Sequence, residues 1–170
     1  MRCKKCFSKY PPPDIIEGVA YFLCEKCCNF HEEKGYEILS EPERAALFQE
    51  KYGLKLPISF IEFKNTDLGW VVKTPKADTD TLRYYFGDGL YEFKTLYRFD
   101  EDDHDSIFHS IISGQEWGLP EKIVPIEGDG HTWLALDYRK NCLNPEVILI
   151  ESDTSEYLTV AHDFDSFLAA

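Results

Sequence analysis

The sequence predicts a mixed helix-and-strand fold that follows a small cysteine-rich block. Two kinds of pattern predict the fold: helix-capping residues ahead of apolar stripes, and glycine-containing turns between runs of aromatic and β-branched residues. The block stands apart because residues 1–36 hold five of the six cysteines. We therefore expect a cysteine-rich part at residues 1–36 and a main domain at residues 40–170.

Residues 40–65 carry two helix signals. Ser40-Glu41-Pro42-Glu43 has the form of a capping box, in which the serine and the later glutamate satisfy free amides at the start of a helix. Gly53 is placed to end this helix. Pro57 suits the first turn of a second, short helix over residues 58–65.

Residues 70–99 change to a strand pattern. Trp70-Val71-Val72 is an apolar run that contains two β-branched valines, and two aromatic runs follow at residues 83–86 and 90–99. Gly87-Asp88-Gly89 separates the two runs, and glycine readily takes the positive φ angles of tight turns. The sequence therefore predicts a hairpin of residues 83–86 with residues 90–99.

The remaining residues predict one helix, two hairpins and a final helix. The acidic stretch 100–105 complements the dipole of a helix whose apolar residues begin at Ile107. Asp163 can cap the final helix, which has an apolar stripe. The predicted hairpins join residues 122–126 to 132–138 and residues 147–151 to 157–161.

Two Cys-x-x-Cys pairs form the strongest chemical signal in the sequence. Seventeen residues separate the pairs, within the range at which four thiolates converge on one tetrahedral zinc ion. A site closed by four sulfurs leaves no position for substrate, so we expect a structural Zn²⁺ and not a catalytic one. Free or redox-active thiols are the alternative. The expected ligands are Cys3, Cys6, Cys24 and Cys27, with Cys28 and His31 as spare candidates for the fourth position.

Composition narrows the class of protein. The chain of 170 residues is 44% hydrophobic, enough for a sizeable core, and no apolar run approaches the length of about 20 residues that spans a bilayer. The first residues lack the apolar segment of a secretory signal, so we expect a reducing compartment, the cytoplasm. The net charge of -13 repels nucleic acid and favours basic partners.

A series of short segments from about residue 43 to the end follows a recognisable order. The segments are Tyr52-Gly53-Leu54-Lys55-Leu56-Pro57-Ile58-Ser59-Phe60-Ile61-Glu62-Phe63, Trp117-Gly118-Leu119-Pro120, Val124-Pro125-Ile126-Glu127-Gly128-Asp129-Gly130, Leu134-Ala135-Leu136-Asp137-Tyr138-Arg139, Pro145-Glu146-Val147 and Val160-Ala161-His162-Asp163-Phe164-Asp165-Ser166-Phe167-Leu168. In this order and spacing the chain resembles the SUKH superfamily of Smi/Knr-type proteins. The resemblance implies an α+β fold with helices packed on a mostly antiparallel sheet, and a binding module that is not an enzyme. The bacterial members of that superfamily include immunity proteins that neutralise toxins, often nucleases, and the fungal members include regulators of cell-wall synthesis.

Two other functions stay open at this point. A metal-dependent hydrolase or nucleotide-processing enzyme would use His131 and Asp129 beside the predicted turn, although no phosphate-binding loop or nucleophile motif is present. Alternatively, the cysteine-rich block is a zinc-ribbon adaptor for protein or nucleic acid. That role needs local basic and aromatic residues such as Lys4, Lys5, Phe7, Lys9 and Tyr10.

For a protein-binding module, aromatic anchors and acids at turns and strand ends are the best candidates for the partner surface. An acidic body suits the capture of a basic toxin domain, because complementary charge speeds encounter. The expected contact residues are Trp70, Asp129, His131 and Trp133. For the two tryptophans, ordinary packing in the core is the alternative.

Overall fold

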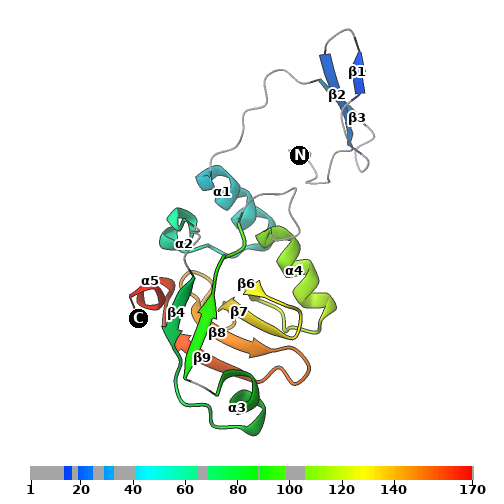
Figure 1. Ribbon diagram of the computed structural model, residues 1–170. Coiled ribbons are helices and arrows are strands. Elements are labelled where there is room, and N and C mark those ends of the chain that lie inside the picture. The colour runs from blue at the N-terminus through cyan, green and yellow to red at the C-terminus, as the bar shows by residue number, and fades with distance from the viewer. Residues whose placement is uncertain are drawn as a thin grey trace. The chain divides into compact units, whose positions relative to one another are not determined.

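The computed structural model describes residues 14–16, 19–24, 29–32, 41–64, 69–87, 89–98 and 106–169 (Figure 1). The chain divides into two compact units, Met1–Leu39 and Ser40–Ala170. In the described part of the chain, no helix is both long enough and apolar enough to cross a membrane.

The first unit contains a three-stranded antiparallel sheet in the order β1-β2-β3. Cys24 ends β2 and pairs with Asn29, the first residue of β3, so residues 25–28 connect two neighbouring strands. His31 belongs to β3. The strands are β1 (Asp14–Ile16), β2 (Val19–Cys24) and β3 (Asn29–Glu32). The other expected zinc ligands, Cys3, Cys6, Cys27 and the spare Cys28, lie outside the described residues.

The second unit begins with the two predicted helices. α1 (Glu41–Tyr52) ends at Gly53, whose N–H donates back to the carbonyl of Gln49 and whose φ of 68° turns the chain out of the helix. α2 (Ile58–Glu62) follows Pro57, as the sequence predicts, but stops at Glu62 because Phe63 leaves the helical conformation.

The predicted hairpin of residues 83–86 with residues 90–99 is wrong. Residues 80–86 form a helix, α3 (Asp80–Phe86), whose first turn is capped by the Thr79 hydroxyl accepting the N–H of Leu82. β5 (Leu90–Phe93) pairs instead with β4 (Trp70–Lys73) in a two-stranded antiparallel sheet. Leu82 and Phe86, one helical turn apart, are both buried, so core packing selects the helix over the β propensity of the aromatic run.

The main sheet has four antiparallel strands in sequence order, which confirms the two later hairpins. The strands are β6 (Ile123–Gly128), β7 (Thr132–Asp137), β8 (Glu146–Glu151) and β9 (Tyr157–Ala161). α4 (Ile107–Glu116) packs beside β6, and α5 (Phe164–Leu168) packs on β8 and β9 (Figure 1). Ser106 caps α4, and the acidic stretch 100–105 lies outside the described residues. Asp163 caps α5, as predicted.

Both faces of the main sheet are covered. Along β7, Leu134 and Leu136 join a large core with the helices, whereas Trp133 and Ala135 join a smaller cluster on the other face. This alternation follows from the two-residue period of side chains along a strand. The unit is therefore an α+β structure of helices on antiparallel sheets, as the sequence resemblance implies.

Arg98 joins two helices, α1 and α2, at the edge of the large core. Its guanidinium donates to the carbonyl oxygens of Phe60 and Ile61 at 2.8 and 2.9 Å, and to the Glu41 carboxylate at 2.8 Å. Burial raises the pKa of Glu41, but hydrogen bonds and charges from Arg98 and Lys64 outweigh this and lower the pKa overall. Arg98 thus ties the start of α1 to the end of α2.

Candidate functional site: an acid–aromatic face

Asp129 shapes the turn between β6 and β7. Its Oδ1 atom accepts the backbone N–H groups of His131 and Thr132, both at 3.0 Å, and its own N–H donates to the carbonyl of Thr132 at 3.2 Å. Partial burial raises the pKa of Asp129, but the hydrogen bonds from Thr132 and His131 outweigh it, so the pKa lies below its ordinary value. The carboxyl group is therefore a fixed negative charge at neutral pH.

Glu151 plays the same part in the turn between β8 and β9. Its carboxylate accepts the N–H groups of Asp153 at 2.7 Å and Thr154 at 2.9 Å, and the hydroxyl of Thr154 at 2.7 Å. Burial raises the pKa of Glu151, but these hydrogen bonds outweigh it and the pKa is lowered. A second fixed negative charge thus lies at a second turn.

Ser152 joins the two turns. Its N–H donates to the carbonyl of His131 at 2.9 Å, and its hydroxyl donates to the carbonyl of Gly130 at 3.0 Å. The same Gly130 carbonyl accepts the indole N–H of Trp133 at 3.2 Å. Since both turns share these buried hydrogen bonds, their backbones hold one another in place.

Trp117 lies over this pair of turns, just after the end of α4. Its ring packs edge-on against the imidazole of His131, with the ring centroids 5.1 Å apart. A Cβ atom added at Gly130 would come within 2.9 Å of the indole, so the Gly130 backbone is in close contact with Trp117. The indole is nevertheless 46% exposed, and a large part of an aromatic ring therefore faces solvent.

α3 brings two further aromatic side chains to the surface. Tyr84 is 82% exposed and Tyr85 is 40% exposed, and their rings pack edge to face. The Thr79 hydroxyl donates to Glu156, which fixes the start of α3 to the segment before β9. Partial burial raises the pKa of Tyr85, and the nearby negative charges of Glu151, Asp153 and Asp129 raise it further.

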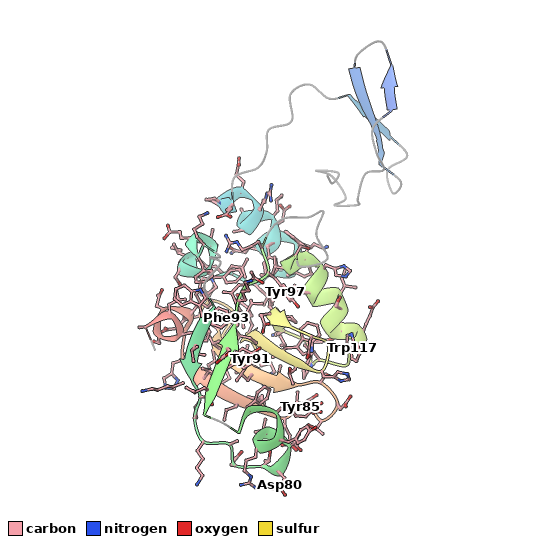
Figure 2. All side chains as sticks on the ribbon, in the orientation of Figure 1. Asp80, Tyr85, Tyr91, Phe93, Tyr97 and Trp117 are labelled. Atoms are coloured by element: carbon pink, nitrogen blue, oxygen red, sulfur yellow. The ribbon has the colours of Figure 1, made fainter. Side chains whose placement is uncertain are left out.

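These side chains make one surface, which we call the acid–aromatic face and define by Tyr85, Trp117, Asp129, His131 and Asp153. Figure 2 shows Tyr85 and Trp117 on the same side of the second unit. Among the described residues, none of the ion pairs involves Asp129, Glu151 or Asp153. The face therefore combines exposed rings with acidic groups that have no salt-bridge partner in the described ranges.

The expected contact residues fall in different environments. Asp129 and His131 lie together on the acid–aromatic face, and both are exposed. Trp133 is only 4% exposed and supports the turn from the core, so the expectation that it is a surface aromatic is wrong. Trp70 lies in β4, half-buried against Phe63, and its indole N–H is buried without a partner. Core packing thus holds both tryptophans.

Sequence reasoning missed three members of the face. Trp117 directly follows α4 and precedes Gly118, so the sequence indicates a helix end there but not whether the ring is exposed. Asp153 lies in the turn between two strongly predicted strands. Tyr85 could be found only by recognising α3, whose signal is Thr79 followed by buried residues four apart, Leu82 and Phe86.

Within the described ranges, no group of three or more His, Cys, Asp or Glu side chains is arranged to hold a metal ion. Asp129 and His131 are adjacent in the turn, but the Asp129 oxygen that faces His131 accepts two backbone N–H groups. This geometry favours a role of Asp129 in shaping a surface over a role in binding a catalytic metal.

Among protein families, the SMI1 / KNR4 family (SUKH-1) matches residues 41–170. No curated protein and no solved structure gives a match. The match starts with α1 and includes every element of the second unit. Since it covers well over half of the chain, the protein belongs to the SMI1 / KNR4 (SUKH-1) family.

Proposed function

We propose that this protein is an immunity protein, a binding module that neutralises a toxin of the nuclease type in the cytoplasm. Membership of the SUKH-1 family fits either an immunity role or a cell-wall related role. The observation that favours direct binding of a protein is the acid–aromatic face, where exposed rings lie beside a hydrogen-bonded pair of turns whose acids have no salt-bridge partner among the described residues. Such rings and charges dominate the energetics of protein interfaces.

Charge supports a nuclease as the target. Enzymes that bind phosphate backbones carry positive charge along the binding surface, and a net charge of -13 attracts such a surface at long range. An acidic protein that docks there takes the place of the nucleic acid. Neutralisation then needs no chemical step by the immunity protein, and we assign no catalytic residue.

We also propose a structural zinc ion in the first unit, bound by Cys3, Cys6, Cys24 and Cys27. The backbone supports this assignment in one respect: Cys24 ends β2, and the four residues that lead to β3 include Cys27. Cys-x-x-Cys pairs are a common way to present two thiolates to one ion. The ion would stabilise a unit that is too small to bury a large core.

The experiment that tests the immunity role uses the genes beside the one for this protein. A toxin encoded there is expressed in a bacterial host with or without this protein, with a catalytically inactive toxin as the control. We expect the protein to restore growth and to form a complex with the toxin that survives gel filtration. Continued killing by the toxin, with no complex formed by the purified proteins, would reject the proposal.

A further inference from the structure

The molecule already holds one arginine between a carboxylate and an aromatic ring. The Arg139 guanidinium donates to the Asp137 carboxylate at 2.9 Å from Nε and 2.7 Å from Nη2, and lies 4.5 Å from the centre of the Tyr157 ring. The hydrogen bonds to Asp137 raise the pKa of Arg139. A planar guanidinium suits this combination because it can donate in its plane and stack through its face.

Arg98 has a related environment. Its guanidinium lies 5.7 Å from the centre of the Phe60 ring while it donates to Glu41. At two places, therefore, a carboxylate and an aromatic ring come together and an arginine of the same chain lies between them.

The acid–aromatic face offers the same pair of groups, but no Lys or Arg side chain in the described part of the chain pairs with them; His131 lies beside Asp129 and interacts with its charge. Trp117 and Tyr85 provide the rings, and Asp129 and Asp153 provide the charges. Among the described residues, no cation–π contact or ion pair involves any of these four side chains. Lys51, Arg98 and Arg139, which do make cation–π contacts, use the rings of Tyr52, Phe60 and Tyr157 instead.

We propose that the acid–aromatic face binds an arginine side chain on a protruding basic segment of the protein partner. This inference rests on the proposed function, since the partner is the toxin. The guanidinium stacks on an exposed ring, Trp117 or Tyr85, and Asp129 and Asp153 supply the opposite charge. Lysine fits less well, because its ammonium is a compact, strongly hydrated charge that cannot stack.

The turns are organised for this role before any partner arrives. Asp129 and Glu151 use their hydrogen bonds to close their own turns, and Ser152 fixes one turn to the other. Little ordering is needed on binding, and a surface that is already ordered gains affinity for that reason. The turn hydrogen bonds of Asp129 use its Oδ1 atom, so the two exposed rings, the Asp153 carboxylate and Oδ2 of Asp129 are the groups that remain to contact the arginine.

The first test examines the face without the toxin. The full chain, labelled with ¹⁵N, is titrated with N-acetylarginine methylamide, and the lysine and glycine analogues serve as controls. We expect saturable shifts of the Trp117 indole N–H and of the amides of Tyr85, His131 and Asp153, at concentrations several-fold lower for arginine than for lysine. Equal shifts with arginine and lysine, spread over acidic residues elsewhere, would overturn the proposal.

Two variants that carry the same net charge form a matched pair for this titration. Asp129→Asn removes a charge from the face but keeps an Oδ1 atom that can accept the N–H groups of the turn, so the fold is retained. Asp165→Asn removes one negative charge on α5, which lies on the opposite side of the second unit from Trp117 (Figures 1 and 2). We expect Asp129→Asn to weaken arginine binding severalfold and Asp165→Asn to leave it unchanged. Equal effects of the two substitutions would contradict the assignment.

The second test uses the toxin. Trp117→Leu and the double substitution Asp129→Asn, Asp153→Asn are expected to weaken toxin binding by about tenfold or more. Leu143→Ser is the control, because Leu143 is 68% exposed on a separate groove formed with Ile58 and Ser59. The ¹⁵N spectrum of each variant reports whether the fold is intact.

The two tests separate this inference from the proposed function. If the toxin binds the wild type and the face variants equally, the immunity role stands and the arginine site is rejected. If no toxin binds but arginine selectively shifts the face, the immunity role fails and the site stands.

Discussion

The backbone of Gly130 packs directly against the indole of Trp117. An added Cβ atom would lie 2.9 Å from Cε2 of the ring, and the φ angle of Gly130, 101°, is one that side-chain-bearing residues rarely adopt. We predict that Gly130→Ala lowers the free energy of unfolding by about 3–4 kcal/mol, because the strained backbone and the displaced indole both contribute. Urea denaturation followed by tryptophan fluorescence measures the change.

Gly89→Ala is the matched control for Gly130→Ala. Gly89 also has a positive φ, 72°, but an added Cβ atom would meet nothing within 4 Å. Its expected cost is the backbone strain alone, about 1–2 kcal/mol. If both substitutions cost the same, the contact between Gly130 and Trp117 contributes nothing to stability.

Arg98→Lys tests the connection between α1 and α2. Lysine keeps the charge opposite Glu41, but its single ammonium cannot donate to Glu41 and to the carbonyls of Phe60 and Ile61 with the geometry of a guanidinium. We expect a loss of about 1–3 kcal/mol in the free energy of unfolding, measured by urea denaturation at neutral pH. Lys64→Gln, at an exposed partner of the same Glu41, should cost less than about 1 kcal/mol. If Lys64→Gln costs more than Arg98→Lys, the main stabilising contact of Glu41 is the exposed one with Lys64.

Glu127 gives a prediction about pH. Burial raises the pKa of Glu127, and the hydrogen bond from the Tyr91 hydroxyl offsets only part of this increase. A carboxyl group whose pKa is higher in the folded state favours folding when it is protonated and opposes folding as the pH rises through that pKa. At neutral pH the charged form of Glu127 therefore works against folding.

We accordingly expect Glu127→Gln to be more stable than the wild type at pH 7, with an advantage that disappears below about pH 4. Glutamine keeps an oxygen that can accept the hydroxyl of Tyr91. Chemical denaturation at the two pH values measures this difference, and Glu92→Gln, at an exposed position of β5, controls for net charge. A less stable Glu127→Gln variant at pH 7 would mean that the charged hydrogen bond with Tyr91 outweighs burial.

The zinc proposal predicts a metal content and a stability effect confined to the first unit. Four thiolates bind one tetrahedral zinc ion, so protein purified without chelator should contain about one zinc ion per chain. Cys24→Ser should lower that content. Cys142, a free cysteine in the second unit, provides the control Cys142→Ser, which should leave the zinc content unchanged. Elemental analysis gives the content. A chain without metal, in which every thiol reacts with a titrant, would reject the proposal.

Removal of the metal should leave the second unit folded. That unit has its own large core, and the expected ligands all belong to Met1–Leu39. The amide spectrum of residues 41–169 should therefore persist in chelator while signals of the first unit change. Global unfolding by chelator would show that the two units depend on each other.

The elements that the sequence predicts correctly are those whose boundaries depend on local chemistry. Gly53 ends α1, Asp163 caps α5, and the glycines around Asp129 close the turn between β6 and β7. The error at α3 has a different cause. The run Arg83–Phe86 has high β propensity, and only the burial of Leu82 and Phe86 against distant parts of the chain selects a helix.

The residues of the candidate site likewise fall into those that local sequence indicates and those that depend on tertiary packing. Asp129 and His131 can be grouped from the sequence because they lie in one recognisable turn. Trp117, Tyr85 and Asp153 come from three other segments, and their assembly depends on how α3 and α4 pack against the sheet. Trp133 could not be told from a surface aromatic, since its position on a strand fixes the face to which it points but not what covers that face.

The hydrogen bonds of Ser152 fix the backbone frame of the two turns, whereas the exposed side chains on the turns are available for contact. The frame depends on the main chain, on the carboxylates of Asp129 and Glu151, on the hydroxyl of Ser152 and on the buried indole of Trp133. Positions 131 and 153, which lie on the turns, can therefore accept other side chains while the loop backbones stay in place. If the contact residues of a partner change, single substitutions at these positions could restore the fit. The same property makes the face a starting point for engineering new binding specificities.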